Sequence, residues 1–162
     1  MAIKKLWAPW RMEFIREKKS DKKRCVFCAA LKSSDDRENL ILHRAKHSFV
    51  ILNKYPYNNG HLMVVPNRHT AQWESLAAET SREVMRLTQE AVVALKKVHN
   101  PQGFNMGMNL GAAAGAGILD HLHFHIVPRW TGDTNFMPVL SETRCMPQHL
   151  MATYDELFNA FA

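Results

Sequence analysis

The sequence predicts an α+β domain in which an antiparallel sheet of about five strands packs against one long helix and a C-terminal helix. Runs rich in β-branched and aromatic residues, bounded by turn residues, occupy 38–66 and return over 104–127. Between them, apolar residues recur at intervals of three, four or their multiples over 73–98, which is the helical period. Strands that pair through short turns and one long amphipathic helix indicate this fold class.

The first three strands are predicted at 38–43 ("ENLILH"), 47–54 ("HSFVILNK") and 61–66 ("HLMVVP"). A short turn joins the first two. Between the second and third, "YPYNNG" (55–60) contains the proline, asparagines and glycine that reverse a chain.

The long helix is predicted to end near Pro101 and Gly103, two residues that disfavour its continuation. After it, "FNMGMNLG" (104–111) alternates as a strand. A loop of small residues, "AAAGAG" (112–117), then leads into "DHLHFHIVPRW" (120–130). A final helix is expected from about Pro147 to Phe161.

The composition is that of an ordinary soluble globular protein, with 162 residues, 46% hydrophobic and 22% charged. No apolar run approaches the roughly 18 residues of a membrane span, and no secretory signal is visible at the N-terminus. Three cysteines are too few and too scattered for a disulfide framework. We therefore expect a cytoplasmic protein without membrane association.

Positive charge is concentrated at the N-terminus. Residues 1–24 hold nine Lys/Arg against three Asp/Glu, which accounts for the whole net charge of +6. We predict a basic leader over 1–24, followed by a single domain over 25–162. Such a leader attracts polyphosphate or nucleic acid, or is simply a solvated segment. The solvated segment is the interpretation we favour, so nucleic-acid binding stays an alternative.

Three histidines alternate with hydrophobic residues at His121, His123 and His125. In a strand they share one face, roughly 6.6 Å apart along it, and we expect Pro128 to close that strand. Because burying imidazoles without partners costs free energy, packing alone does not explain the pattern. A zinc site and a catalytic site both remain open, since imidazole is a metal ligand, a nucleophile and a proton-transfer group.

Two neighbouring motifs bear on this choice. The Gly/Ala-rich loop "NLGAAAGAG" (109–117) lets backbone N–H groups come close to an anion, so a phosphate beside an imidazole nucleophile is a coherent site. The motif "CVFC" (25–28) is ambiguous on its own between a redox pair, half of a metal site and coincidence.

The stretch "HLHFHIVP" resembles the His-φ-His-φ-His-φφ signature of the histidine triad (HIT) family of nucleotide hydrolases and transferases, where φ is hydrophobic. "LNKYPYNNGHLMVVP" (52–66) is similar to the family's strand–turn–strand, and "CVFC" lies where many bacterial members carry Cys-x-x-Cys. "LWAPWRM", "GFNMGMNLG" and "HIVPRW" most resemble the bacterial branch related to diadenosine tetraphosphate phosphorylases and Fhit-like hydrolases.

This resemblance implies an enzyme that cleaves dinucleoside polyphosphates at the α-phosphate. His123 would attack the α-phosphorus and form a covalent nucleotidyl-histidine, which divides one hard displacement into two. His125 would contact the phosphate and support the transition state, with His61 beside the triad. The substrate-binding residues implied are Asn53 at the ribose hydroxyls, and Asn109, Gly115 and Gly117 along the phosphate path.

One position departs from the family pattern. Related enzymes often carry Gln-Ser or Gln-Thr in the loop before the triad, where the side chains assist the leaving group. Here the comparable place reads Ala116-Gly117. Backbone contacts to the phosphates survive this change, whereas side-chain assistance does not, so the substrate is less firmly implied than the nucleophile.

The resemblance also implies a structural Zn²⁺, held by Cys25, Cys28, His69 and His121. A Cys₂His₂ set forms a sound tetrahedral site, and it would make the first triad histidine a ligand and not a catalytic group. A homodimer is expected from the same resemblance. The alternatives are a nucleoside phosphoramidate hydrolase, a zinc-stabilised nucleotide- or nucleic-acid-binding module without turnover, and a triad that forms a catalytic metal centre.

Overall fold

A five-stranded antiparallel sheet forms the centre of the fold in the computed structural model, which describes residues 25–136 and 146–161. The strand order is β1-β2-β3-β5-β4, and each strand is antiparallel to its neighbours. The α+β fold with about five strands is therefore confirmed, whereas the predicted leader over 1–24 lies outside the described residues. The strands are β1 (Ile41–Arg44), β2 (Ser48–Leu52), β3 (Leu62–Pro66), β4 (Gly103–Gly107) and β5 (Phe124–Arg129).

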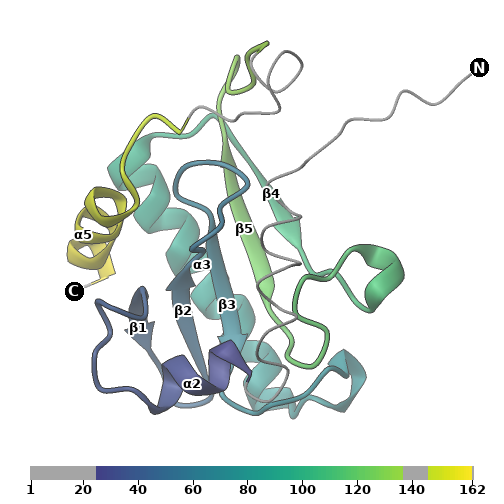
Figure 1. The fold of residues 1–162 in the computed structure, drawn as a ribbon. Coiled ribbons are helices and arrows are strands. Elements are labelled where there is room, and N and C mark those ends of the chain that lie inside the picture. Colours follow the sequence, from purple (N-terminus) through teal and green to yellow (C-terminus); the bar gives the residue numbers. More distant parts are fainter. Residues whose placement is uncertain (1–24, 137–145, 162) are drawn as a thin grey trace, which may run out of the picture.

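Helices cover this sheet, and Figure 1 shows the long helix α3 behind the strands with α5 beside it. Helix α3 packs against β2, β3 and β5, and α5 packs against α3 and β1. No helix within the described ranges combines the length and apolarity needed to cross a membrane. The helices and short 3₁₀ turns are α2 (Val26–Lys32), η1 (Trp73–Ser75), α3 (Ala78–His99), η2 (Ala112–Ala114) and α5 (Leu150–Phe161).

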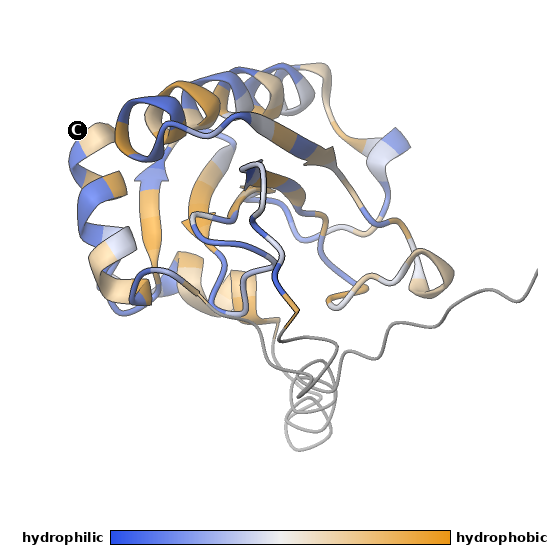
Figure 2. Cartoon of the chain, turned by 90° about the horizontal axis from the view of Figure 1, so that it is seen from above, coloured by the Kyte–Doolittle hydropathy of each residue, from blue (hydrophilic) through white to orange (hydrophobic). Residues whose placement is uncertain are grey.

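The core lies between α3 and the central strands. Every residue of β2 and β3 is buried, as expected of strands covered on both faces. In Figure 2 the helices carry both hydrophilic and hydrophobic segments, which is the pattern of elements with one buried face. Each fully buried leucine of α3, such as Leu87 and Leu95, stabilises the fold by about 1.5–3 kcal/mol.

The helices differ from prediction at two places. The expected start of the long helix at Trp73 is wrong, because the chain leaves the η1 turn in extended conformation at Leu76 and Ala77 before α3 begins. Its end is correct, since Asn100 takes the left-handed conformation with φ 45°. Helix α2 was not predicted at all, because seven residues are too few to show a helical period.

The histidine-rich strand is shorter and later than predicted. Its ladder begins at Phe124, so His121 and His123 precede it. Pro128 does not close the strand but pairs with Phe104 of β4. A proline is tolerated there because the pairing with β3 already ends at Ile126, so no donor is needed on that side. Strand β4 likewise ends at Gly107, not at residue 111.

Candidate active site and metal centre

Two buried histidines from neighbouring strands form the centre of the candidate active site. His61 lies just before β3, and His125 lies on β5, where it pairs with Met63. The Nε2 atom of His61 is 2.9 Å from Nδ1 of His125. The antiparallel register of β3 and β5 thus brings together two residues that are far apart in the sequence.

The proton positions in this pair follow from the loop before β3. The backbone N–H of Tyr57 donates to Nδ1 of His61 at 3.0 Å, so that nitrogen is an acceptor. A neutral His61 therefore carries its proton on Nε2 and donates it to Nδ1 of His125. His125 then carries its own proton on Nε2, which makes that nitrogen a donor.

Burial keeps this arrangement neutral. His61 is fully buried, and burial, followed by the nearby His125 and His123, lowers the pKa of His61 to about 3. At neutral pH the ring is therefore uncharged, and its Nε2–H donates to Nδ1 of His125. Asn53 favours the same tautomer of His61, because its side-chain Nδ2, a donor, lies 3.3 Å from Nδ1 of His61.

The third histidine of interest, His123, has the opposite proton arrangement. Its Nδ1 lies 2.9 Å from the backbone oxygen of His121, and a carbonyl only accepts hydrogen bonds. The proton of a neutral His123 therefore resides on Nδ1, and Nε2 carries the lone pair. The rings of His123 and His125 are 4.8 Å apart between centroids. The ring of His123, with a lone pair on Nε2, thus lies next to the ring of His125, with a proton on Nε2.

A separate cluster beside the triad brings together Cys25, Cys28, His69 and His121, with one potential ligand atom each and all four within 4.8 Å of one another. Nδ1 of His121 lies 3.3 Å from Sγ of Cys25 and 3.2 Å from Nδ1 of His69. Sγ of Cys28 lies 3.4 Å from Nδ1 of His69. Zinc–ligand bonds in a tetrahedral site place ligand atoms roughly 3.3–3.8 Å apart, so these residues could hold such an ion.

The protonation chemistry of the cluster also suits a cation. Nε2 of His121 donates to the backbone oxygen of Pro66 at 2.8 Å, which directs the Nδ1 lone pair into the cluster. Burial lowers the pKa of His121, which keeps the ring neutral as a ligand must be. Burial and the neighbouring Cys25 raise the pKa of the Cys28 thiol, and a bound divalent cation would reverse that effect.

Helix α2 connects the cluster to the triad. Cys28 lies in this helix, Cys25 is its N-cap residue, and Phe27 between them is buried. The Phe27 ring lies 5.4 Å from the His121 ring and 5.3 Å from the His123 ring, measured between centroids. Sequence reasoning missed Phe27 because the helix itself was not predicted.

Sequence reasoning also missed Tyr57. The sequence predicts only a turn over 55–60, but the Tyr57 ring lies 4.7 Å from the ring of His61 and 5.6 Å from that of His125. The available signal was an aromatic residue placed shortly before "NNGH".

The remaining predicted substrate-binding residues come from the loop between β4 and β5. Asn109 and Gly117 are half-buried there, and Gly115 takes the left-handed conformation with φ 81° that ends η2. The N–H of Gly115 donates to the oxygen of Ala112 at 3.0 Å, so this donor is engaged within the loop itself. The structure thus unites the histidines with Asn53, while the phosphate-path residues belong to a separate segment.

Comparisons with known proteins give consistent matches. The HIT domain family model matches residues 35–132. An AP-4-A phosphorylase of Mycobacterium tuberculosis (strain H37Rv) is 40% identical over 157 residues, which cover 93% of this chain and 80% of that protein. Adenosine 5′-monophosphoramidase of Schizosaccharomyces pombe is 30% identical over 105 residues, covering 65% of this chain and 74% of that protein.

Among solved structures, a Zn-bound histidine triad family protein from Mycobacterium smegmatis superposes with a TM-score of 0.68. It is 28% identical, and the match covers 85% of this chain and 92% of that one.

Proposed function

Because the chain belongs to the HIT domain family, we propose that it is an enzyme that cleaves dinucleoside polyphosphates, such as diadenosine tetraphosphate, at the α-phosphate. The observation that carries this proposal is the hydrogen-bond geometry from which we assign opposite tautomers to His123 and His125. The 40% identity to an AP-4-A phosphorylase supports the substrate class.

His123 is the proposed nucleophile. The lone pair on its Nε2 forms a P–N bond with the α-phosphorus, while the bond to the bridging oxygen breaks and its electron pair leaves with ATP. Water or inorganic phosphate then attacks the phosphorus, the P–N bond breaks and its electron pair returns to Nε2. The acceptor's proton passes to solvent.

His125 and His61 support that displacement. The Nε2–H of His125 donates to a phosphoryl oxygen, where negative charge builds up in the transition state. His61 keeps this donor in place because its own Nε2–H occupies the Nδ1 lone pair of His125. Since both donors are fixed before substrate binds, little reorganisation is needed during the reaction.

Substrate binding is assigned to Asn53 at the ribose hydroxyls and to Asn109, Gly115 and Gly117 along the polyphosphate. Ala116 and Gly117 offer no polar side chain to the leaving group. The leaving ATP therefore relies on backbone donors of the β4–β5 loop other than the N–H of Gly115, which already donates to Ala112, and on hydration of its own negative charge.

The cluster of Cys25, Cys28, His69 and His121 is proposed to hold a structural Zn²⁺. Its donor set and ligand spacing fit tetrahedral zinc, and the Mycobacterium smegmatis protein is Zn-bound. When bound, the ion would supply folding free energy by linking α2 to the segment before β5.

Product analysis with diadenosine tetraphosphate, with and without inorganic phosphate, tests the proposed reaction. ADP and ATP that appear only with phosphate indicate phosphorolysis, whereas AMP and ATP without phosphate indicate hydrolysis. We expect His123→Ala to abolish turnover and His149→Ala, at an exposed histidine, to leave it unchanged. Wild-type activity in His123→Ala would refute the nucleophile.

A second candidate function is hydrolysis of nucleoside phosphoramidates. The 30% identity to adenosine 5′-monophosphoramidase and the Ala116-Gly117 departure favour it, because an amine leaving group needs different assistance from a polyphosphate. Release of AMP from adenosine 5′-monophosphoramidate, with no reaction of diadenosine tetraphosphate in either condition, would select this function.

A further inference from the structure

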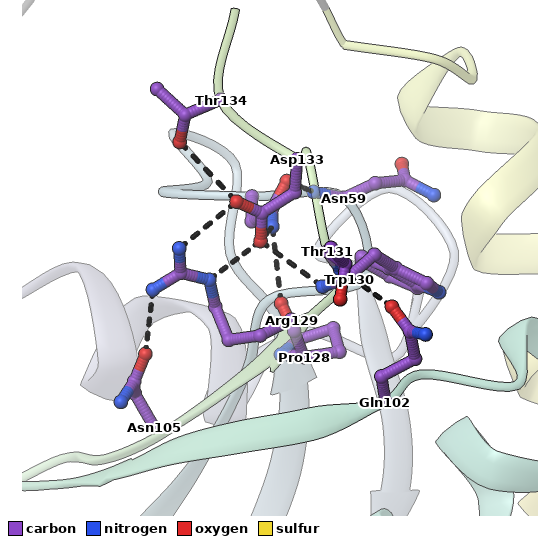
Figure 3. A network of polar contacts seen from close by, with 10 residues as sticks. Asn59, Gln102, Asn105, Pro128, Arg129, Trp130, Thr131, Asp133 and Thr134 are labelled. Atoms are coloured by element: carbon purple, nitrogen blue, oxygen red, sulfur yellow. Dashed lines mark hydrogen bonds and ion pairs between the residues drawn. The ribbon is translucent and has the colours of Figure 1, made fainter.

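The turn after β5 contains a carboxylate, Asp133, at the centre of a polar network shown in Figure 3. Asp133 accepts hydrogen bonds from Arg129 at 2.6 Å and 2.9 Å and from the backbone N–H of Trp130 at 3.1 Å. Its side chain is only 9% exposed. The hydrogen bonds from Arg129 hold the pKa of this carboxyl well below its usual range, so it stays charged.

This network is tied to the loop that joins β2 and β3. Nδ2 of Asn58 donates to Asp133 at 2.9 Å and to the backbone oxygen of Pro128 at 3.1 Å. The backbone oxygen of Asn58 accepts the N–H of His61 at 3.2 Å. Asn58 is therefore fixed both to the end of β5 and to the start of β3.

Tyr57, the residue before Asn58, makes the contact that sets the tautomers of His61 and His125. Its N–H donates to Nδ1 of His61, and its ring packs on His61 and His125. If this N–H moves away, only the longer contact from Asn53 favours the Nε2–H tautomer of His61. In the other tautomer, His61 accepts from His125, which then presents a lone pair, not a proton, at Nε2.

We propose that Asp133 and Asn58 are positioning residues that hold the 53–60 loop, so that the Tyr57 N–H fixes the tautomers of His61 and His125. This inference rests on the proposed function for its effect on rate. Its effect on the tautomers concerns the free protein alone. Neither residue needs to contact substrate, because each acts through the loop.

Two readouts test this role: kinetics with diadenosine tetraphosphate, and imidazole ¹⁵N NMR of histidine-labelled free protein. Asn58→Ala removes the link to Asp133. Thr134→Ala is the matched control, because Thr134 donates to the same carboxylate at 3.2 Å but lies outside the 53–60 loop. We expect Asn58→Ala to lower kcat about ten- to a hundredfold with KM nearly unchanged, and to change the Nδ1 signal of His61 from acceptor to mixed character. Thr134→Ala should change neither.

An unchanged Nδ1 signal of His61 in Asn58→Ala would overturn the proposal, even if activity fell. If Asn58→Ala does not fold, Asp133→Leu tests the same link, because it keeps the approximate side-chain size and removes both acceptor oxygens. If the wild-type protein does not turn over the substrate, the proposed function fails, while the NMR comparison still decides whether these residues position the histidines.

Discussion

Substitution of Gly60 by alanine is expected to destabilise the protein strongly, and the structure gives the size of the effect. Gly60 directly precedes His61 and has φ +72°, a conformation that costs an L-residue about 1–2 kcal/mol. An added Cβ would lie 3.0 Å from Cδ2 of Leu95 and 3.2 Å from Cδ2 of His99. Overpacking of this kind costs about 1–3 kcal/mol.

The two contributions sum to about 2–5 kcal/mol, or about 1–4.6 kcal/mol once the lower entropy of the unfolded alanine chain, about 0.4–1 kcal/mol, is subtracted. Two controls separate the contributions. At Gly132, φ is +79° and an added Cβ meets nothing within 4 Å, so Gly132→Ala should lose only about 1 kcal/mol. At Gly103 neither strain nor contact applies, so Gly103→Ala should gain about 0.4–1 kcal/mol from the lower entropy of its unfolded chain.

Urea unfolding of the three variants, analysed with a common m-value, measures these differences. We expect Gly103→Ala to be the most stable variant, Gly132→Ala to be intermediate and Gly60→Ala to be the least stable. Equal losses in Gly60→Ala and Gly132→Ala would show that Leu95 and His99 yield to the new methyl group, and the packing argument would then be wrong.

Two further predictions concern the metal cluster and acid stability. Cys28→Ser should lose bound zinc and lower the melting temperature by roughly 10 °C, which corresponds to about 3–5 kcal/mol for a chain of this size. The control Ala29→Ser, on the exposed side of α2, should retain the wild-type zinc content and melting temperature. Wild-type zinc content in Cys28→Ser, measured by metal analysis, would contradict the ligand assignment. Folding lowers the pKa of His61 from 6.5 to about 3. As the pH falls from 6.5 to about 3, this histidine is therefore protonated in the unfolded chain but not in the folded one. The free energy of unfolding should decline by up to about 1.4 kcal/mol per pH unit over that range. Urea unfolding at several pH values should show a shallower decline in His61→Gln, and an identical decline would mean that the wild-type ring is not buried in its neutral form.

The sheet and the long helix could be predicted because their signals are local. Apolar runs separated by "YPYNNG" predict β2 and β3, and the periodicity over 73–98 predicts α3 apart from its start. Helix α2 has no comparable signal. Its seven residues are held by long-range contacts, such as those of Phe27 with His121 and Phe49, which no local pattern contains.

The histidine segment shows how far a local pattern reaches. Alternation predicts which residues are related, but it does not show where the ladder starts. The N–H of Leu122 donates to the backbone oxygen of Thr70 at 2.8 Å, and the ring of His121 donates to the oxygen of Pro66. These contacts hold the segment before Phe124 outside the β5 ladder. They depend on residues more than fifty positions away, so periodicity could not reveal them.

The structure also explains why three histidines with one sequence pattern have three different environments. The side chain of His121 belongs to the cysteine–histidine cluster, while its backbone oxygen fixes the proton of His123 on Nδ1. His125 is fixed from the opposite side, through His61 and the N–H of Tyr57. The two tautomers on which the proposed reaction depends are therefore set by separate parts of the fold. Substitutions in the cluster should therefore affect the nucleophile, His123, most directly, whereas substitutions in the 53–60 loop should affect the donor, His125.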